Sequence, residues 1–171
     1  MKIKTAGARL RFLCERKLLM NDIYEIQKLL YSYCWLIDSG DFDGVCELLK
    51  DADIYYSGKL TYQKDPKGYM NTLKPIVRYE DGTPKTSHMC IDPIIEVAPD
   101  GLSATAKSYT VVVQGITGQM PPQIIWVDRK LDTFQKVEGH WRFQSRDFIT
   151  RAEGDTAKHI DMSVFTRKKK K

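Results

Sequence analysis

A one-faced helical pattern followed by four strand patterns is the feature that most constrains how this chain folds. From residue 22 onward, apolar side chains recur at spacings that place them on one face of a helix. They are Ile23, Ile26, Leu29, Leu30, Tyr33 and Ile37. Asp22 and Glu25 have the spacing of a capping box, so we expect the helix to begin at residue 22, and Ser39-Gly40-Asp41 is typical of its end.

Two shorter helices and a β-rich half follow. One helix is expected from about Asp41, and another after Asp65-Pro66, an N-cap with a first-turn proline. Residues 53–62 are typical of a short strand or hairpin. Strand patterns then cover residues 86–97, 103–114, 123–136 and 140–150. This order predicts an α+β domain, with three N-terminal helices packed against a curved, mainly antiparallel sheet.

The net charge of +5 is concentrated at the two ends of the chain. Residues 167–171 carry +5 and residues 1–19 carry another +5, which leaves residues 20–166 with −5. A body that is acidic overall lacks the basic face that phosphate binding requires, so we expect no nucleic-acid partner. No apolar run approaches the roughly 20 residues that span a bilayer, so we expect no membrane span.

The same distribution divides the chain into three parts. Residues 1–19 are interpreted as a basic N-terminal extension, disordered or absent from the native protein, because Met20-Asn21-Asp22 looks like an ordinary protein start. An organelle transit peptide is the other interpretation of this stretch. Residues 20–155 are expected to form one domain large enough to enclose a pocket. Residues 156–171 are expected to be a C-terminal tail with a basic end.

The four cysteines and three histidines do not have the spacing of a metal site or a disulfide framework. Cys34, Cys46 and Cys90 stand among apolar residues, where a reduced thiol behaves as a small buried hydrophobe. Reduced thiols are typical of a cytoplasmic protein. The glycines form no phosphate-binding loop. We therefore expect no metal and no other cofactor.

Three short motifs resemble the SnoaL-like branch of the nuclear transport factor 2-like superfamily, over residues 21–152. Tyr33-x-x-x-x-Asp38-x-x-Asp41 is similar to the end of the first helix in bile-acid 7α-dehydratases and scytalone dehydratases. Ser87-His88-Met89 is similar to the segment that carries their catalytic histidine. Asp132-x-Phe134-x-Lys136-x-x-Gly139-x-Trp141 resembles the hairpin before the last strand. The resemblance implies a cone-shaped α+β barrel that encloses a pocket.

The resemblance, together with the chemistry of dehydration, predicts an acid–base pair of Asp38 and His88. Eliminating water beside a carbonyl requires a base for a carbon-bound proton, and histidine titrates near neutral pH. A carboxylate bonded to the other ring nitrogen fixes the tautomer and stabilises the imidazolium. Asp38 stands at a helix C-terminus, where a carboxylate opposes the helix dipole and needs a partner. Purely structural hydrogen bonds of both residues are the alternative.

Further residues are candidates for the pocket. Tyr33 is the candidate for a third catalytic residue, whose hydroxyl would polarise a substrate oxygen or donate to a leaving group; core packing is its alternative. The predicted substrate-binding residues are Tyr31, Tyr55, Tyr56, Met70, Met89, Trp126 and Arg146. Neighbouring strand residues alternate in direction, so only one of Tyr55 and Tyr56 is expected to face inward. The arginine would bind an acidic group.

By resemblance, we expect a cofactor-independent small-molecule lyase, in particular a dehydratase, that acts on a hydrophobic cyclic substrate such as a steroid, polyketide or aromatic-derived compound. Two alternatives remain open. One is a non-catalytic ligand-binding or structural subunit, such as the small subunit of a ring-hydroxylating dioxygenase. The other is an isomerase or polyketide cyclase that uses the same base. The curved sheet also predicts a homo-oligomer, a trimer by the resemblance or else a dimer.

Overall fold

The computed structural model describes residues 2–166, and the side chains of residues 17–164. The helices are α1 (Lys2–Asp38), α2 (Phe42–Leu48), α3 (Pro66–Leu73) and α4 (Ser163–Thr166). The strands are β1 (Asp53–Tyr56), β2 (Lys59–Gln63), β3 (Thr86–Val97), β4 (Ser103–Ile116), β5 (Met120–Val137) and β6 (His140–Glu153). The predicted order of helices and strands is therefore confirmed.

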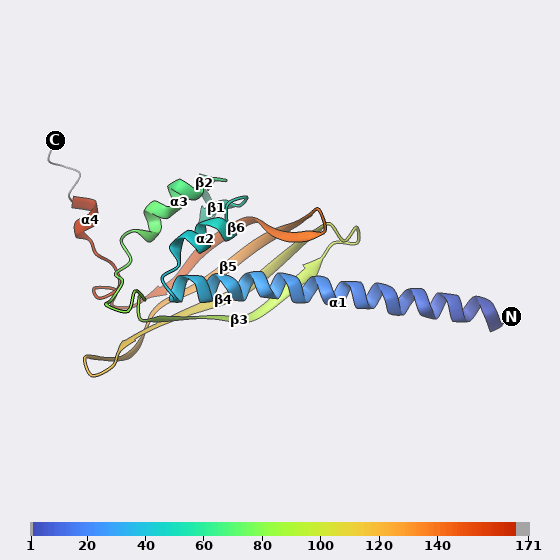
Figure 1. Ribbon diagram of the computed structural model, residues 1–171, viewed down its shortest axis with the longest axis horizontal. Coiled ribbons are helices and arrows are strands. Elements are labelled where there is room, and N and C mark those ends of the chain that lie inside the picture. Colours follow the sequence, from blue (N-terminus) through green and yellow to red (C-terminus); the bar gives the residue numbers. More distant parts are fainter. Residues whose placement is uncertain (1, 167–171) are drawn as a thin grey trace.

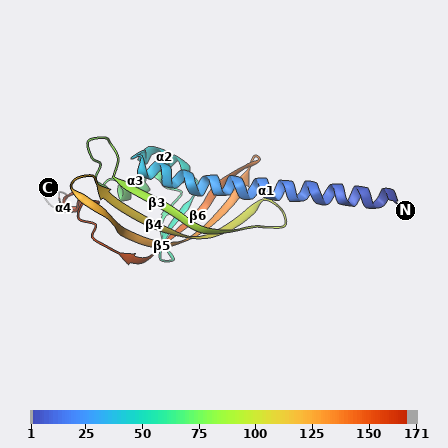
Figure 2. The same cartoon turned by 90° about the horizontal axis from the view of Figure 1, so that it is seen from below.

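The six strands form one curved sheet in the order β2-β1-β6-β5-β4-β3. All neighbours are antiparallel except β1 and β6, which pair in parallel. Helices α1, α2 and α3 lie on one face of this sheet, as Figures 1 and 2 show. The tight β5–β6 turn uses Glu138 and Gly139, both with positive φ (51° and 83°), as two-residue hairpin turns require. The predicted α+β fold with a mainly antiparallel sheet is confirmed.

The core lies between α1 and the concave face of the sheet. The predicted apolar face of α1 is buried, with exposed fractions of 0% for Ile26 and 1% for Leu30. These side chains meet Phe134 and Phe143, whose ring centroids are 4.8 Å apart on neighbouring strands. Cys34 and Cys46 are buried in the same cluster as free thiols. The same cluster extends to Tyr33, Tyr69 and Phe148, so the core is continuous with the residues around the cavity described below.

The predicted start of the first helix is wrong. The helix does not begin at Asp22 but runs from Lys2, and its N-terminal part extends beyond the sheet (Figures 1 and 2). Residues 8–21 contain no proline or glycine to end a helix. Asp22 is no cap, because its Oδ1 accepts hydrogen bonds from Trp141 Nε1 (2.9 Å) and Lys136 Nζ (2.5 Å). The division of the chain at residues 20 and 155 stays a prediction.

The other local signals agree with the structure more closely. The Asp41 and Asp65 carboxylates each accept a backbone N–H three residues on, at 2.8 Å, as N-caps of α2 and α3. Strand β3 spans the predicted residues 86–97, while the next three strands extend a few residues beyond their predicted ends. Within residues 2–166, no helix is long and apolar enough to cross a membrane.

The segment after β6 returns to the body of the protein. The His159 carbonyl accepts the Val77 N–H, and the Asp161 N–H donates to the Pro75 carbonyl, both at 2.8 Å. Ile160 forms an isolated bridge with Ile76. This stretch of the predicted tail is therefore attached to the connection between α3 and β3. The basic end of the tail, residues 167–171, lies outside the described residues.

Candidate active site

Asp38 and His88 are in direct contact. Asp38, the last residue of α1, reaches the start of β3, where its Oδ1 lies 2.6 Å from His88 Nδ1. Asp38 Oδ2 accepts the backbone N–H of His88 at 2.7 Å, and Thr86 Oγ1 donates to Asp38 Oδ1 at 2.7 Å. Both carboxylate oxygens are thus held by residues of one strand. This rigid arrangement fixes the plane of the imidazole ring.

These hydrogen bonds also determine the charge of the pair. Burial of Asp38 opposes its ionisation, but the hydrogen bonds from His88 and Thr86 outweigh it and hold the pKa of the carboxyl below its usual range. An ionised carboxylate only accepts hydrogen bonds, so the proton between the two side chains sits on Nδ1 of His88. Among the described residues, none forms a hydrogen bond with Nε2. Its lone pair is available to take a proton.

His88 lines a cavity of about 240 Å³ between the helices and the sheet. The remaining walls are mostly aromatic and aliphatic. They are Tyr33, Ile37, Tyr56, Tyr69, Thr72, Leu73, Ile76, Thr110, Val112, Trp126, Asp128, Lys130, Phe148, Thr150, His159 and Ile160. Such a mostly apolar pocket with a few polar groups is typical of a small-molecule site.

Tyr33 lies between the histidine and a second tyrosine. Its ring stands edge-on to His88, with centroids 6.4 Å apart, and its hydroxyl is 3.4 Å from that of Tyr69. Burial raises the pKa of Tyr33 to about 12, although the nearby Arg146 acts against this. At neutral pH the Tyr33 hydroxyl therefore remains a hydrogen-bond donor.

The predicted substrate-binding residues divide into two groups. Tyr56 and Trp126 line the cavity, and the Tyr56 ring stacks on Phe148 with centroids 5.2 Å apart. The other predicted residues do not line it: Tyr31, Tyr55, Met70, Met89 and Arg146. Tyr31 and Met89 each leave 42% of their surface exposed. Both side chains lie on the outer side of their element. For Met89 this follows from strand alternation, because it is the immediate neighbour of the inward-facing His88.

Arg146 is occupied by another residue of the sheet. Its Nε and one terminal nitrogen donate to the two carboxylate oxygens of Asp132, at 2.7 and 2.9 Å, and the pair is buried. The guanidinium carbon lies 4.5 Å from the centroid of the Tyr33 ring. In this position Arg146 packs against the Tyr33 ring, and its second terminal nitrogen, Nη1, is buried without a hydrogen-bond partner among the described residues.

Comparison with known proteins identifies the family. The model of the SnoaL-like domain matches residues 19–147. This chain belongs to the SnoaL-like domain family. A search of curated proteins finds no significant match.

Solved structures show the same fold as this SnoaL-like domain. An NTF2-like protein with a cystatin-like fold from Novosphingobium aromaticivorans is 22% identical, with a TM-score of 0.61 over 91% of this chain and 94% of that chain. A candidate scytalone dehydratase from the same species is 19% identical, with a TM-score of 0.64 over 82% and 91%. Hexachlorocyclohexane dehydrochlorinase LinA-type3 from Novosphingobium barchaimii is 14% identical, with a TM-score of 0.63 over 83% and 94%.

Sequence reasoning missed four ionisable residues of this SnoaL-like cavity: Tyr69, Asp128, Lys130 and His159. The signal for two of them was present. Asp128 and Lys130 are an even number of residues from buried Phe134 on β5, so strand alternation places all three on the same side of the sheet. The intervening Arg129 is exposed. His159 follows the last strand and carried no such signal.

The His159 ring is buried against Trp126, with centroids 6.2 Å apart. Burial, with a further contribution from His88, lowers the pKa of His159 to about 4. Its Nδ1 has no hydrogen-bond partner among the described residues. His159 is therefore neutral at physiological pH and lines the same cavity as His88.

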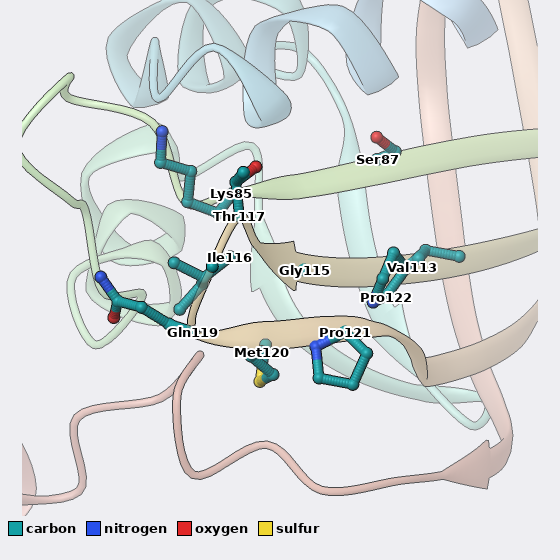
Figure 3. A pocket seen from close by; sticks show the side chains of 11 residues that line it. Lys85, Ser87, Val113, Gly115, Ile116, Thr117, Gln119, Met120, Pro121 and Pro122 are labelled. Carbon is teal, nitrogen blue, oxygen red and sulfur yellow. The ribbon is translucent and has the colours of Figure 1, made fainter.

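Larger hollows lie outside the cone of the SnoaL-like domain. The one in Figure 3, of about 610 Å³, is formed by the β4–β5 hairpin and the start of β3. Ser87 borders it, one residue from His88 and on the opposite side of β3, and neither Asp38 nor His88 takes part. Another hollow of about 570 Å³ reaches the outer side of the Asp38–His88 pair beside exposed Trp35. Within the described residues, no three His, Cys, Asp or Glu side chains gather as metal ligands.

Proposed function

We propose that this SnoaL-like protein is a cofactor-independent lyase, a dehydratase, in which His88 removes a proton from carbon with support from Asp38. The observation that supports it is the 2.6 Å contact between Asp38 Oδ1 and His88 Nδ1 at the wall of a largely apolar cavity. A carboxylate in this position holds an imidazole as a base in unrelated enzymes.

In the proposed reaction, Nε2 of His88 takes a proton from the carbon beside a carbonyl group. The electrons of that bond form an enolate, and the C–O bond on the next carbon then breaks. The leaving hydroxyl takes the proton back from the imidazolium, so the net change is the loss of one water molecule. Asp38 stabilises the imidazolium between these two steps, and the Tyr33 hydroxyl donates a hydrogen bond to the leaving oxygen.

The size of the cavity limits the substrate. A volume of about 240 Å³ equals that of about eight waters in the liquid, at about 30 Å³ each. A one- or two-ring compound derived from an aromatic or a polyketide suits this volume better than a steroid. The aromatic walls from Tyr56, Trp126 and Phe148 favour a flat ring. We therefore propose a small cyclic β-hydroxy ketone as the substrate.

The test is turnover of a panel of one- and two-ring β-hydroxy ketones, followed by the absorbance of the conjugated product. His88→Gln and Asp38→Asn are each expected to lower kcat by about 100-fold or more, the usual contribution of a positioned acid–base group. His140→Gln is the matched control, because His140 is exposed at the start of β6. Unchanged turnover in both site variants would refute the assignment.

Two alternatives predict different results in the same assay. An isomerase with the same base gives a His88-dependent product of unchanged mass, and a cyclase gives a product with a new ring. Neither forms a conjugated ketone by loss of water. A non-catalytic subunit gives no His88-dependent product from any compound of the panel. Analysis of the products by mass spectrometry separates these cases.

We also propose that the protein forms a homo-oligomer, a trimer or else a dimer. The support is a group of exposed apolar side chains on the outer face of β3 and β4. Met89, Ile91 and Tyr109 have exposed fractions of 42%, 36% and 48%, and the last two are paired across the strands. Contiguous apolar surface of this kind marks an interaction face.

A further inference from the structure

A buried ion pair stands in the wall of the cavity, apart from the Asp38–His88 pair. Lys130 Nζ lies 2.6 Å from Asp128 Oδ2, and only 3% of the Lys130 side chain is exposed. Nζ also lies 4.0 Å from the centroid of the Phe148 ring on β6. Lysine is almost never buried without a partner, and burying an ion pair costs desolvation free energy. A shell of apolar side chains would fill this wall at lower cost.

The pair leaves hydrogen-bonding capacity unused. An ammonium group has three donors, but within the described part of the chain Asp128 is the sole acceptor for Lys130 Nζ. The other oxygen of Asp128, Oδ1, is buried and has no hydrogen-bond partner among the residues that the structure describes. A buried donor without an acceptor costs free energy, and a ligand oxygen can recover it by accepting a hydrogen bond from Lys130 Nζ. Asp128 Oδ1 is an acceptor and would need a donor instead.

Lys130 is also the only lysine or arginine among the described residues that line the cavity. Arg146 is nearby, but two of its guanidinium nitrogens donate to Asp132 and its side chain does not line the cavity. Burial lowers the pKa of Lys130 to about 8 against the opposing effect of Asp128, with Arg146 lowering it further and Asp132 raising it. The ammonium form therefore predominates at neutral pH, in surroundings that hydrate it poorly.

We propose that Lys130, held in place by Asp128, binds a negatively charged ligand oxygen, that of an enolate or a phenolate, inside the cavity that His88 lines. This inference rests on the proposed function, because the enolate formed by proton removal is the anion to be stabilised. A charge-assisted hydrogen bond in a dry pocket is stronger than one in water. The substrate class that follows is a cyclic ketone whose oxygen reaches Lys130 while its α-carbon faces His88.

The test uses 4-nitrophenol, a one-ring phenol whose phenolate is yellow and whose neutral form is colourless. The full-length protein is titrated with it at pH 6, where the free compound is mostly neutral and Lys130 is charged. The wild-type protein is expected to bind it with the appearance of the yellow band, because the ammonium favours the phenolate. Lys130→Met is expected to weaken phenolate binding by about tenfold or more, the usual contribution of a charged hydrogen bond.

The matched control is Lys136→Met. Lys136 lies on the same strand, pairs with Asp22 and stands over the Trp141 ring, but does not line the cavity. It is expected to bind the phenolate as the wild type does. Because Lys130→Met leaves Asp128 buried and unpaired, the double variant Asp128→Asn with Lys130→Met is measured beside it, and it is also expected to lose the yellow band.

Two results would overturn the inference: a wild-type protein that does not bind the phenolate, or a folded Lys130 variant that binds it within twofold of the wild type. His88→Gln is expected to keep phenolate binding, because His88 Nε2 is a proton acceptor that the bound phenolate does not need. If the proposed dehydratase reaction is not found, phenolate binding at Lys130 can still be observed. Failure of the proposed function and failure of this inference are therefore distinguishable.

Discussion

Replacing His159 with glutamine is expected to make the protein less sensitive to acid. The buried His159 ring has its pKa lowered to about 4, whereas a histidine in an unfolded chain titrates at about 6.5. Between these two pKa values the unfolded state binds more protons than the folded state. The stability that neutral His159 contributes is therefore present above about pH 6.5 and is lost as the pH falls towards 4. From pH 7.5 to 4.5 this linkage amounts to about 2 to 3 kcal/mol, at 1.36 kcal/mol per pKa unit.

The assay is urea unfolding at pH 7.5 and pH 4.5, read by tryptophan fluorescence, for the wild type, His159→Gln and His140→Gln. The free energy of unfolding of the wild type is expected to fall by about 2 to 3 kcal/mol more than that of His159→Gln between the two pH values. His140→Gln is expected to behave as the wild type, since His140 is exposed. Equal losses in the wild type and His159→Gln would refute the reasoning that the ring is buried and neutral.

Two other predictions concern the carboxylate and the assembly. Thr86→Val removes one of the hydrogen bonds to Asp38. It is expected to lower kcat by about three- to tenfold and to raise the pKa of Asp38 in the pH profile of kcat. An unchanged pH profile would contradict the role of Thr86. Sedimentation velocity is expected to give a trimer or a dimer that Tyr109→Lys converts to a monomer, and a monomeric wild type would contradict the proposed assembly.

The Asp38–His88 pair could be predicted from the resemblance of its two segments to SnoaL-like dehydratases and from the chemistry of dehydration, and both residues stand near the ends of well-marked elements. The apolar periodicity of α1 ends at Asp38, and the strand pattern begins two residues before His88. The start of α1 could not be predicted in the same way. Asp22 and Glu25 have the spacing of a capping box, but Asp22 accepts a hydrogen bond from Trp141, far away in the sequence. Local spacing does not reveal such a contact.

The rest of the cavity depends on long-range contacts. The alternation places Asp128 and Lys130 on the same side of β5 as buried Phe134, but their charges masked this signal, because charged residues at alternate positions of a strand normally indicate a solvent-facing side. His159 reaches the cavity because its segment pairs with residues 75–77, more than 80 residues earlier in the chain. No periodicity in the sequence encodes such a contact.

The most direct test of the account is deuterium exchange into a cyclic ketone. Cyclohexanone and 1-tetralone are incubated in D₂O with the wild type, His88→Gln and His140→Gln, and deuterium uptake at the α-carbon is followed by mass spectrometry. If His88 is the base, the wild type and His140→Gln accelerate the exchange of at least one ketone, and His88→Gln lowers that rate by about 100-fold or more. Equal rates for the wild type and His88→Gln would contradict the claim that His88 removes a carbon-bound proton.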